Sequence, residues 1–124
     1  MKCKSTSIRA FIGAKDFNES RAFYQQLGFE ESVLGATMSY FRVNDHLGFY
    51  LQNAYVKDWV NNSMLFLEVD NLDECHKELM EKNLPAQYKN VRLSAIKYED
   101  WGRELFMHDP SGILWHFGEF TKQN

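Results

Sequence analysis

The side chains that could do chemistry in this chain lie mostly in its last quarter. His116 could ligate a metal or hydrogen-bond a ligand, Glu104 could attract a cation at the mouth of a site, and Trp101 offers a flat face for stacking. Ser39 or Ser94 could contribute to a triad, but neither stands in a nucleophile-elbow pattern. The seven glycines are scattered, which argues against a phosphate-binding loop. These residue types favour binding over covalent catalysis.

A hairpin should position this part of the chain. Residues 109–112 read Asp-Pro-Ser-Gly, which is turn chemistry in order, and apolar segments flank them on both sides. If these four residues form the loop, Leu105 lies opposite His116, and the pleat sends Leu105, Leu114 and His116 to one side. Trp115 then points the other way, which predicts that it packs in the core against a helix.

Two segments of the chain match each other at a constant spacing of 55 residues. Each predicts a helix that begins at a short polar cap with a Glu three positions later and ends at a residue that tolerates a left-handed conformation. A strand precedes each helix, at residues 8–12 and 64–69, and residues 37–43 and 47–52 predict a hairpin in the first copy. The matched helix caps are Asp16 with Asn71, Glu19 with Glu74, and Gly28 with Asn83.

Bulk properties predict one domain and limit its partners. The chain has 124 residues, 44% of them hydrophobic and 15% aromatic, which suits a single core. Its net charge of -3 gives no basic footprint, so we expect no nucleic-acid partner. There is no long apolar run and no apolar segment behind the basic start, which predicts a cytoplasmic protein without a membrane partner. Cys3 and Cys75 form no metal-binding or disulfide pattern.

Short motifs throughout the chain resemble a known superfamily. They are Lys15-Asp16-Phe17, Phe23-Tyr24, Leu27-Gly28-Phe29, the run from Glu68 to Asp73, and Trp101-Gly102-Arg103-Glu104 with Asp109-Pro110-x-Gly112. In these the chain is similar to the glyoxalase, bleomycin-resistance and extradiol-dioxygenase (vicinal oxygen chelate) superfamily, and specifically to its bleomycin-binding antibiotic-resistance proteins. The resemblance implies an α+β fold in which two βαβββ modules form curled mixed sheets around a cavity. Module one covers about residues 5–52, a linker about 53–63, and module two about 64–120.

The resemblance also separates binders from metal-dependent enzymes. In the metal-dependent members, one ligand stands on the first strand of each module, where this chain has Arg9 and Met64. A guanidinium has no free lone pair for a cation, and a thioether is a weak ligand for the usual divalent metals. We therefore expect no metal, no cofactor and no enzymatic activity. The alternative is a metal-dependent lyase or dioxygenase that uses His116 with other ligands.

A metal-free binder would hold a planar small molecule, such as a glycopeptide antibiotic of the bleomycin type, in an aromatic cleft. The resemblance implies a stacking role for Trp101, and an inward-pointing Arg9 would need a carboxylate partner or a ligand anion. It also implies a homodimer whose pockets are built from both subunits. A binder of another metabolite remains the second alternative. The expected ligand-binding residues are Trp101, Trp59, Tyr50, Phe41, His116, Glu104 and Arg9.

Overall fold

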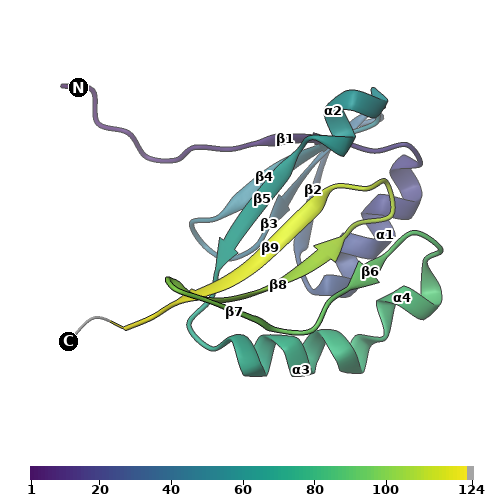
Figure 1. The fold of residues 1–124 in the computed structure, drawn as a ribbon. Coiled ribbons are helices and arrows are strands. Elements are labelled where there is room, and N and C mark those ends of the chain that lie inside the picture. Colours follow the sequence, from purple (N-terminus) through teal and green to yellow (C-terminus); the bar gives the residue numbers. More distant parts are fainter. Residues whose placement is uncertain (123–124) are drawn as a thin grey trace.

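A computed structural model describes residues 1–122 and contains two β-sheets with helices packed on them (Figure 1). The first half of the chain builds the first sheet and one long helix. Its elements are β1 (Phe11–Gly13), α1 (Phe17–Leu27), β2 (Glu30–Gly35), β3 (Met38–Arg42) and β4 (Gly48–Gln52). A short helix, α2 (Lys57–Asn61), then leads into the second half.

The second half repeats this plan with additions. After its helix comes one extra helical turn, and its sheet carries an extra short strand. Its elements are β5 (Met64–Glu68), α3 (Leu72–Lys82), α4 (Leu84–Gln87), β6 (Arg92–Leu93), β7 (Lys97–Glu99), β8 (Gly102–His108) and β9 (Leu114–Phe120).

Strand order confirms the predicted repeat. The first sheet has the order β1-β4-β3-β2, and the second has the order β5-β9-β8-β6 with β7 also paired to β8. In each sheet the first strand of the module runs parallel to its last strand, while the neighbouring pairs of the hairpins are antiparallel. The predicted α+β class with two related mixed sheets is therefore confirmed. Neither sheet closes on itself, because the strand order of each sheet has two free ends.

The helix boundaries follow from local chemistry that recurs 55 residues apart. The side chains of Asp16 and Asn71 each accept a hydrogen bond from the backbone N–H three residues later, at 3.1 and 3.2 Å. These bonds satisfy N–H groups that have no partner within the helix. At the other ends, Gly28 and Asn83 adopt left-handed conformations with φ of 100° and 50°. Both predicted pairs of caps are confirmed.

One core joins the two modules. Trp115 from β9 packs against Tyr24 from α1 and Phe49 from β4, with ring centroids 5.9 and 5.3 Å apart. Phe41 lies in the same cluster, 5.5 Å from Tyr24, and has no exposed surface. The predicted burial of Trp115 is confirmed, since it is only 2% exposed. Because both sheets contribute to this core, their other faces point away from it.

A buried polar network fixes the turn between β8 and β9 against helix α1. Asp109 accepts hydrogen bonds from three consecutive backbone N–H groups, those of Ser111, Gly112 and Ile113, each at 2.9 Å. It also accepts from the Tyr24 hydroxyl at 2.7 Å, and that hydroxyl accepts from the Trp115 indole N–H at 3.0 Å. Burial, with the Asp109 charge nearby, raises the pKa of Tyr24, so the phenol stays a donor at neutral pH.

The same network changes the predicted hairpin register by one residue. His108 lies opposite Leu114 rather than Ile113, so five residues separate the last paired positions instead of four. His116 consequently lies opposite Phe106, and Leu105 lies opposite Phe117. A one-residue slip moves every side chain of one strand to the other face. Leu105 is therefore in the core, and the prediction that it shares a face with His116 was wrong.

Three other segments differ from their predicted structure. Strand β1 begins at Phe11 rather than Ile8, and the first ten residues are exposed and run away from the body (Figure 1). The expected linker contains helix α2. Elements α4, β6 and β7 lie between α3 and β8, where no helix or strand was predicted. No helix within residues 1–122 is long and apolar enough to cross a membrane.

Candidate functional site

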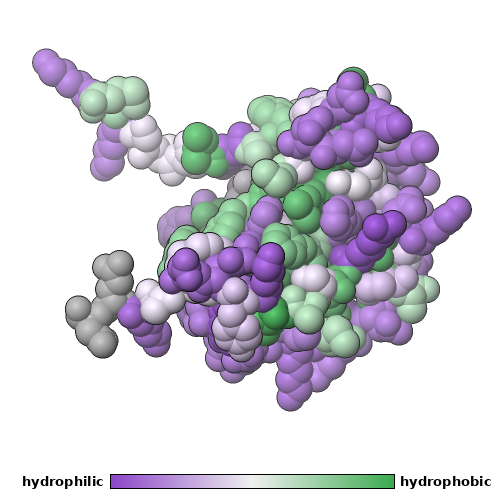
Figure 2. Space-filling model, viewed as in Figure 1, coloured by the Kyte–Doolittle hydropathy of each residue, from purple (hydrophilic) through white to green (hydrophobic). Residues whose placement is uncertain are grey.

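The face of the second sheet that points away from the core carries an exposed aromatic cluster. Side chains alternate along each strand, so Trp115 and Phe117 enter the core while His116, Gly118 and Phe120 face outward. We call this outward surface the β9 face. Figure 2 is drawn in the same view as Figure 1 and shows apolar surface across the middle of the molecule, on the side where β9 lies.

Three rings of the β9 face contact each other. Phe66 from β5 lies 5.8 Å from Trp101 and 5.6 Å from Phe120, and Trp101 lies 5.3 Å from Phe120, measured between centroids. Their exposed fractions are 46%, 37% and 49%. Large aromatic side chains normally bury most of their surface. These three therefore offer a ready stacking surface.

Gly118 makes room for this cluster. The Phe66 ring lies directly over it, and a Cβ added at Gly118 would overlap that ring. Gly118 itself is buried beneath the ring although its strand position faces outward. A larger residue here would push Phe66 away from β9 and change the shape of the stacking surface.

A polar pair lies beside the aromatic rings. Nδ1 of His116 is 2.8 Å from a carboxylate oxygen of Glu104, and their side chains are 21% and 11% exposed. The imidazole ring stacks near Phe66 at 6.1 Å and meets the edge of Phe106 at 5.0 Å. Glu104 thus holds the imidazole in one orientation.

The second ring nitrogen of His116 is available to a ligand. Nε2 has no hydrogen-bond partner in the part of the chain that the structure describes. Within that part, no buried side-chain nitrogen or oxygen lacks a partner, so Nε2 keeps contact with solvent. The β9 face therefore combines flat apolar rings with one fixed, directional polar atom.

The outward face of the first sheet holds a second group of aromatic side chains around a cation. The Arg9 guanidinium lies 4.4 Å from the Tyr40 ring centroid and 5.7 Å from that of Tyr50. Its Nη1 donates a hydrogen bond to the Tyr50 hydroxyl at 2.9 Å, and Phe11 stacks on Tyr50 at 4.6 Å. We call this group the Arg9 cluster.

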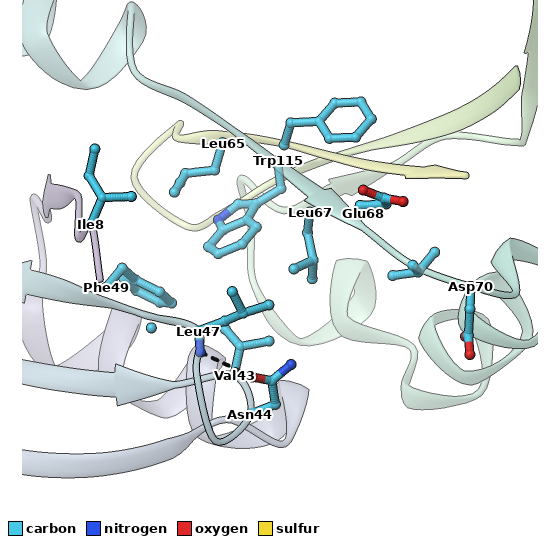
Figure 3. Close-up of a pocket in the computed structure, with 13 residues that line it drawn as sticks. Ile8, Val43, Asn44, Leu47, Phe49, Leu65, Leu67, Glu68, Asp70 and Trp115 are labelled. Carbon is cyan, nitrogen blue, oxygen red and sulfur yellow. Dashed lines mark hydrogen bonds between the residues drawn. The ribbon is translucent and has the colours of Figure 1, made fainter. Parts of the chain in front are cut away.

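A third feature is a groove of about 780 Å³ where the two modules meet (Figure 3). Side chains from β4, its preceding turn, β5 and β9 point into it, and Trp115 and Phe49 lie at its base. Glu68 and Asp70 line its end near α3. None of the seven predicted ligand-binding residues lines this groove, although Phe66 joins it to the β9 face.

The seven predicted residues therefore fall into separate places. Trp101, Glu104 and His116 come together on the β9 face. Tyr50 and Arg9 come together in the Arg9 cluster. Trp59 lies apart from both, because its ring in α2 packs over Gly13 of β1.

Phe41 is the predicted site residue that the fold removes from any surface. It stacks on Phe49 at 5.7 Å, with both rings in the core. Alternation along β3 sends Tyr40 outward and Phe41 inward. The sequence alone does not show which face of β3 points to the core and which points outward.

Metal ligands do not gather at either outward face. Arg9 and Met64, which the resemblance places at the ligand positions of the metal-dependent enzymes, offer no strong donor to a divalent ion, and Met64 is 64% exposed on β5. Residues 1–122 contain no group of three or more His, Cys, Asp or Glu side chains placed to hold an ion. His116 and Glu104 supply only two donors, and these already bond to each other. The residues present do not fit the divalent metal of the enzymes.

Sequence reasoning missed several residues of these surfaces. They are Phe66, Phe106 and Phe120 on the β9 face, and Tyr40 and Phe11 in the Arg9 cluster. Once His116 is known to face outward, the two-residue period of β9 also places Phe120 outward. The same two-residue period places Met64 and Phe66 on one face of β5.

No protein-family model matches the chain, and no curated protein matches it. Among solved structures, it is similar to the bleomycin-binding protein of bleomycin-producing Streptomyces verticillus, complexed with copper(II)-bleomycin. The TM-score is 0.80 at 19% identity, with 96% of this chain and 99% of that chain covered. A glyoxalase/bleomycin resistance protein from Catenulispora acidiphila gives 0.73 at 22% identity, with 94% and 100% covered. An antibiotic-binding protein from Streptomyces sp. CB03234 gives 0.70 at 17% identity, with 98% and 99% covered.

These similarities show the fold class. The chain has the fold of the glyoxalase and bleomycin-resistance proteins, as its motifs predict. The similar structures within that class include proteins named for binding bleomycin or another antibiotic.

Proposed function

We propose that this protein binds a planar small molecule on the β9 face, stoichiometrically and without a metal ion. The observation that carries the proposal is the exposed cluster of Phe66, Trp101 and Phe120 beside the Glu104–His116 pair. Rigid aromatic side chains lose little conformational entropy when they stack on a ligand. His116 Nε2 supplies the polar contact that orients it.

Binding without a metal is favoured by the side chains at the ligand positions of the enzymes. Arg9 carries a permanent positive charge, and Met64 offers only a soft thioether. Elemental analysis of protein purified without chelator tests this part. We expect no divalent metal near one equivalent per chain, and such a metal would favour a lyase or dioxygenase instead.

Bleomycin is the first ligand to test, because proteins of the same fold bind it. Titration with tryptophan fluorescence as the signal should show quenching at micromolar ligand. Trp101→Ala should weaken binding about tenfold or more, since it removes one stacking face and its buried area. Trp59→Phe is the matched control, because Trp59 packs over Gly13 away from the β9 face.

The two variants separate the possible outcomes. Equal affinity of wild type and Trp101→Ala would contradict the proposed site. If bleomycin does not bind, the same titration with metal-free planar heteroaromatic compounds decides whether the β9 face binds ligands of that shape. Failure of both would contradict the proposed function.

We also propose that two copies form a homodimer through their outward faces. Phe11, Met64, Phe66 and Phe120 are each about half exposed or more, at 50%, 64%, 46% and 49%. Apolar patches of this kind commonly mark protein interfaces or ligand sites. Sedimentation equilibrium should give about twice the chain mass of 14.6 kDa. A monomer at micromolar concentration would contradict the dimer and leave the β9 face as a single-chain site.

A further inference from the structure

A small polar pocket lies where the end of helix α2 meets the turn between β8 and β9. Its volume is about 310 Å³, and it is lined by Asn61, Asn90, Arg92, His108, Ser111 and Gly112. None of these residues carries a carboxylate, although the net charge of the chain is -3. The Ser111 hydroxyl already accepts a hydrogen bond from the backbone N–H of Lys15 at 2.9 Å. The other polar side chains, which are hydrogen-bond donors, are left to face a ligand.

The elements around this pocket, which we call the His108 pocket, fix its shape. His108 is the last residue of β8, and it pairs with Arg92 of β6 on one side and with β9 on the other. Its neighbour Met107 enters the core, so the imidazole faces outward. Asn61 ends α2 and lies against the turn, because a Cβ added at Gly112 would be 3.5 Å from its side-chain oxygen. The donors are therefore held in place before a ligand arrives.

These donors are free within the part of the chain that the structure describes. None of the ion pairs among residues 1–122 involves Arg92. Asn90 donates one amide hydrogen to the carbonyl of Pro110 at 3.4 Å and keeps the other. No buried side-chain nitrogen or oxygen of residues 1–122 lacks a partner, so the free N–H groups of Arg92, His108 and Asn61 contact solvent. A ligand with several acceptor oxygens can replace that solvent.

The charge around His108 favours an anion. Burial and then the positive charge of Arg92 lower the pKa of His108. Its neighbours from β9 and α2, Leu114 and Asn61, carry no charge. The adjacent Asp109 is fully buried, and its carboxylate accepts from the backbone of the turn, away from the pocket. An anion between the imidazole and the guanidinium would favour the protonated ring and so raise its pKa.

We propose that the His108 pocket binds a tetrahedral oxyanion, either free or as the phosphate or sulfate group of a small ligand. The guanidinium fork of Arg92 bonds two oxygens, while His108, Asn61 and Asn90 donate from other directions. A volume of about 310 Å³ is at the lower end for ligand pockets, which suits a small ligand. This site goes beyond the proposed function, because it selects negative charge and lies roughly 20 Å from Trp101, at the other end of β8 (Figure 1).

Calorimetric titration with sodium sulfate at constant ionic strength tests the proposal. Sulfate keeps both charges at neutral and mildly acidic pH, so any pH dependence arises in the protein. Wild type should bind one sulfate with a Kd of about 1 mM or below. Arg92→Gln should weaken binding about tenfold or more, because it removes the charge-assisted hydrogen bonds. Lys77→Gln removes the same charge from an exposed position on α3 and should leave binding unchanged.

The imidazole gives a second readout that general charge screening would not move. Saturating sulfate should raise the pKa of His108, followed through its C2–H signal in ¹H NMR, and affinity should increase as the pH falls toward that pKa. The C2–H signal of His46, in the turn between β3 and β4, should not respond to sulfate. His108→Gln should keep weaker binding and lose its pH dependence.

A comparison of phenyl phosphate with inorganic phosphate separates the two sources of the anion. Tighter binding of phenyl phosphate would assign the pocket to a phosphorylated ligand, and equal binding to the free anion, and either result supports the site. The proposal would be overturned by the absence of saturable sulfate binding, by an equal loss of affinity in Lys77→Gln and Arg92→Gln, or by a His108 signal that does not respond.

Discussion

The Tyr24 hydroxyl connects parts of the chain that lie far apart in sequence. It donates to Asp109 in the β8–β9 turn and accepts from the Trp115 indole, so helix α1 is tied to the second sheet. Burial raises the pKa of the Asp109 carboxyl, while its hydrogen bonds to Tyr24 and to three backbone N–H groups act in the opposite direction. These hydrogen bonds therefore offset part, but not all, of the desolvation that burial costs the carboxylate. Each partner in such a network depends on the others.

Tyr24→Phe should destabilise the protein by about 2 kcal/mol or more, because the Asp109 carboxylate loses a donor and the Trp115 indole loses its acceptor. Chemical denaturation followed by circular dichroism measures the change in unfolding free energy. Tyr55→Phe is a suitable control, since Tyr55 is 39% exposed and its removal of one hydroxyl should cost less than about 0.5 kcal/mol. Similar values for the two variants would show that the buried network contributes little.

The individual site residues could be predicted by type but not by direction. Trp101, Glu104 and His116 were chosen for their chemistry, and the fold brings them to one face. Phe41 was chosen on the same grounds and is buried, because its strand can turn either face to the core. The hairpin register depends on how many backbone N–H groups donate hydrogen bonds to the Asp109 side chain. The turn motif alone does not specify that number.

The secondary-structure elements divide into those set by local sequence and those set by distant pairing. Helices α1 and α3 could be predicted with both caps, because capping side chains act within a few residues. Strands β6 and β7 are only two and three residues long and form by pairing with β8, so no local pattern indicated them. β1 is shorter than predicted, because pairing with β4 covers only Phe11 to Gly13.

The two C-terminal helix caps provide a matched pair of substitutions. Gly28→Ala should destabilise the protein by about 1–2 kcal/mol, because its φ of 100° is unfavourable for any residue with a Cβ. A Cβ at Gly28 would meet no atom within 4 Å, so the cost is conformational rather than steric. Asn83→Gly should be neutral or stabilising, because Asn83 already has a left-handed φ of 50°. Thermal unfolding of both variants checks this, and loss of stability in Asn83→Gly alone would contradict the account of the caps.

For the molecule as a whole, the shared core determines where binding can occur. Because both sheets turn their helix-covered faces into one core, the aromatic cluster and the Arg9 cluster lie on surfaces that point away from it. The groove between the modules is a third and separate place, with Trp115 at its base. Two related modules thus present two chemically different faces, one with a Glu–His pair and one with a cation that has no carboxylate partner among residues 1–122.

Two of the three tryptophans mark two of these places and the third lies apart from them, which allows one measurement to locate the ligand. Trp101 belongs to the β9 face, Trp59 packs over Gly13, and Trp115 lies beneath the groove. Each has one indole N–H signal in a ¹H–¹⁵N correlation spectrum, and single substitutions assign them. On titration with bleomycin or a planar heteroaromatic compound that binds, the Trp101 signal should shift while those of Trp59 and Trp115 stay in place. A ligand that shifts Trp115 and leaves Trp101 unchanged would bind in the groove, and would contradict the assignment of the β9 face as the binding site.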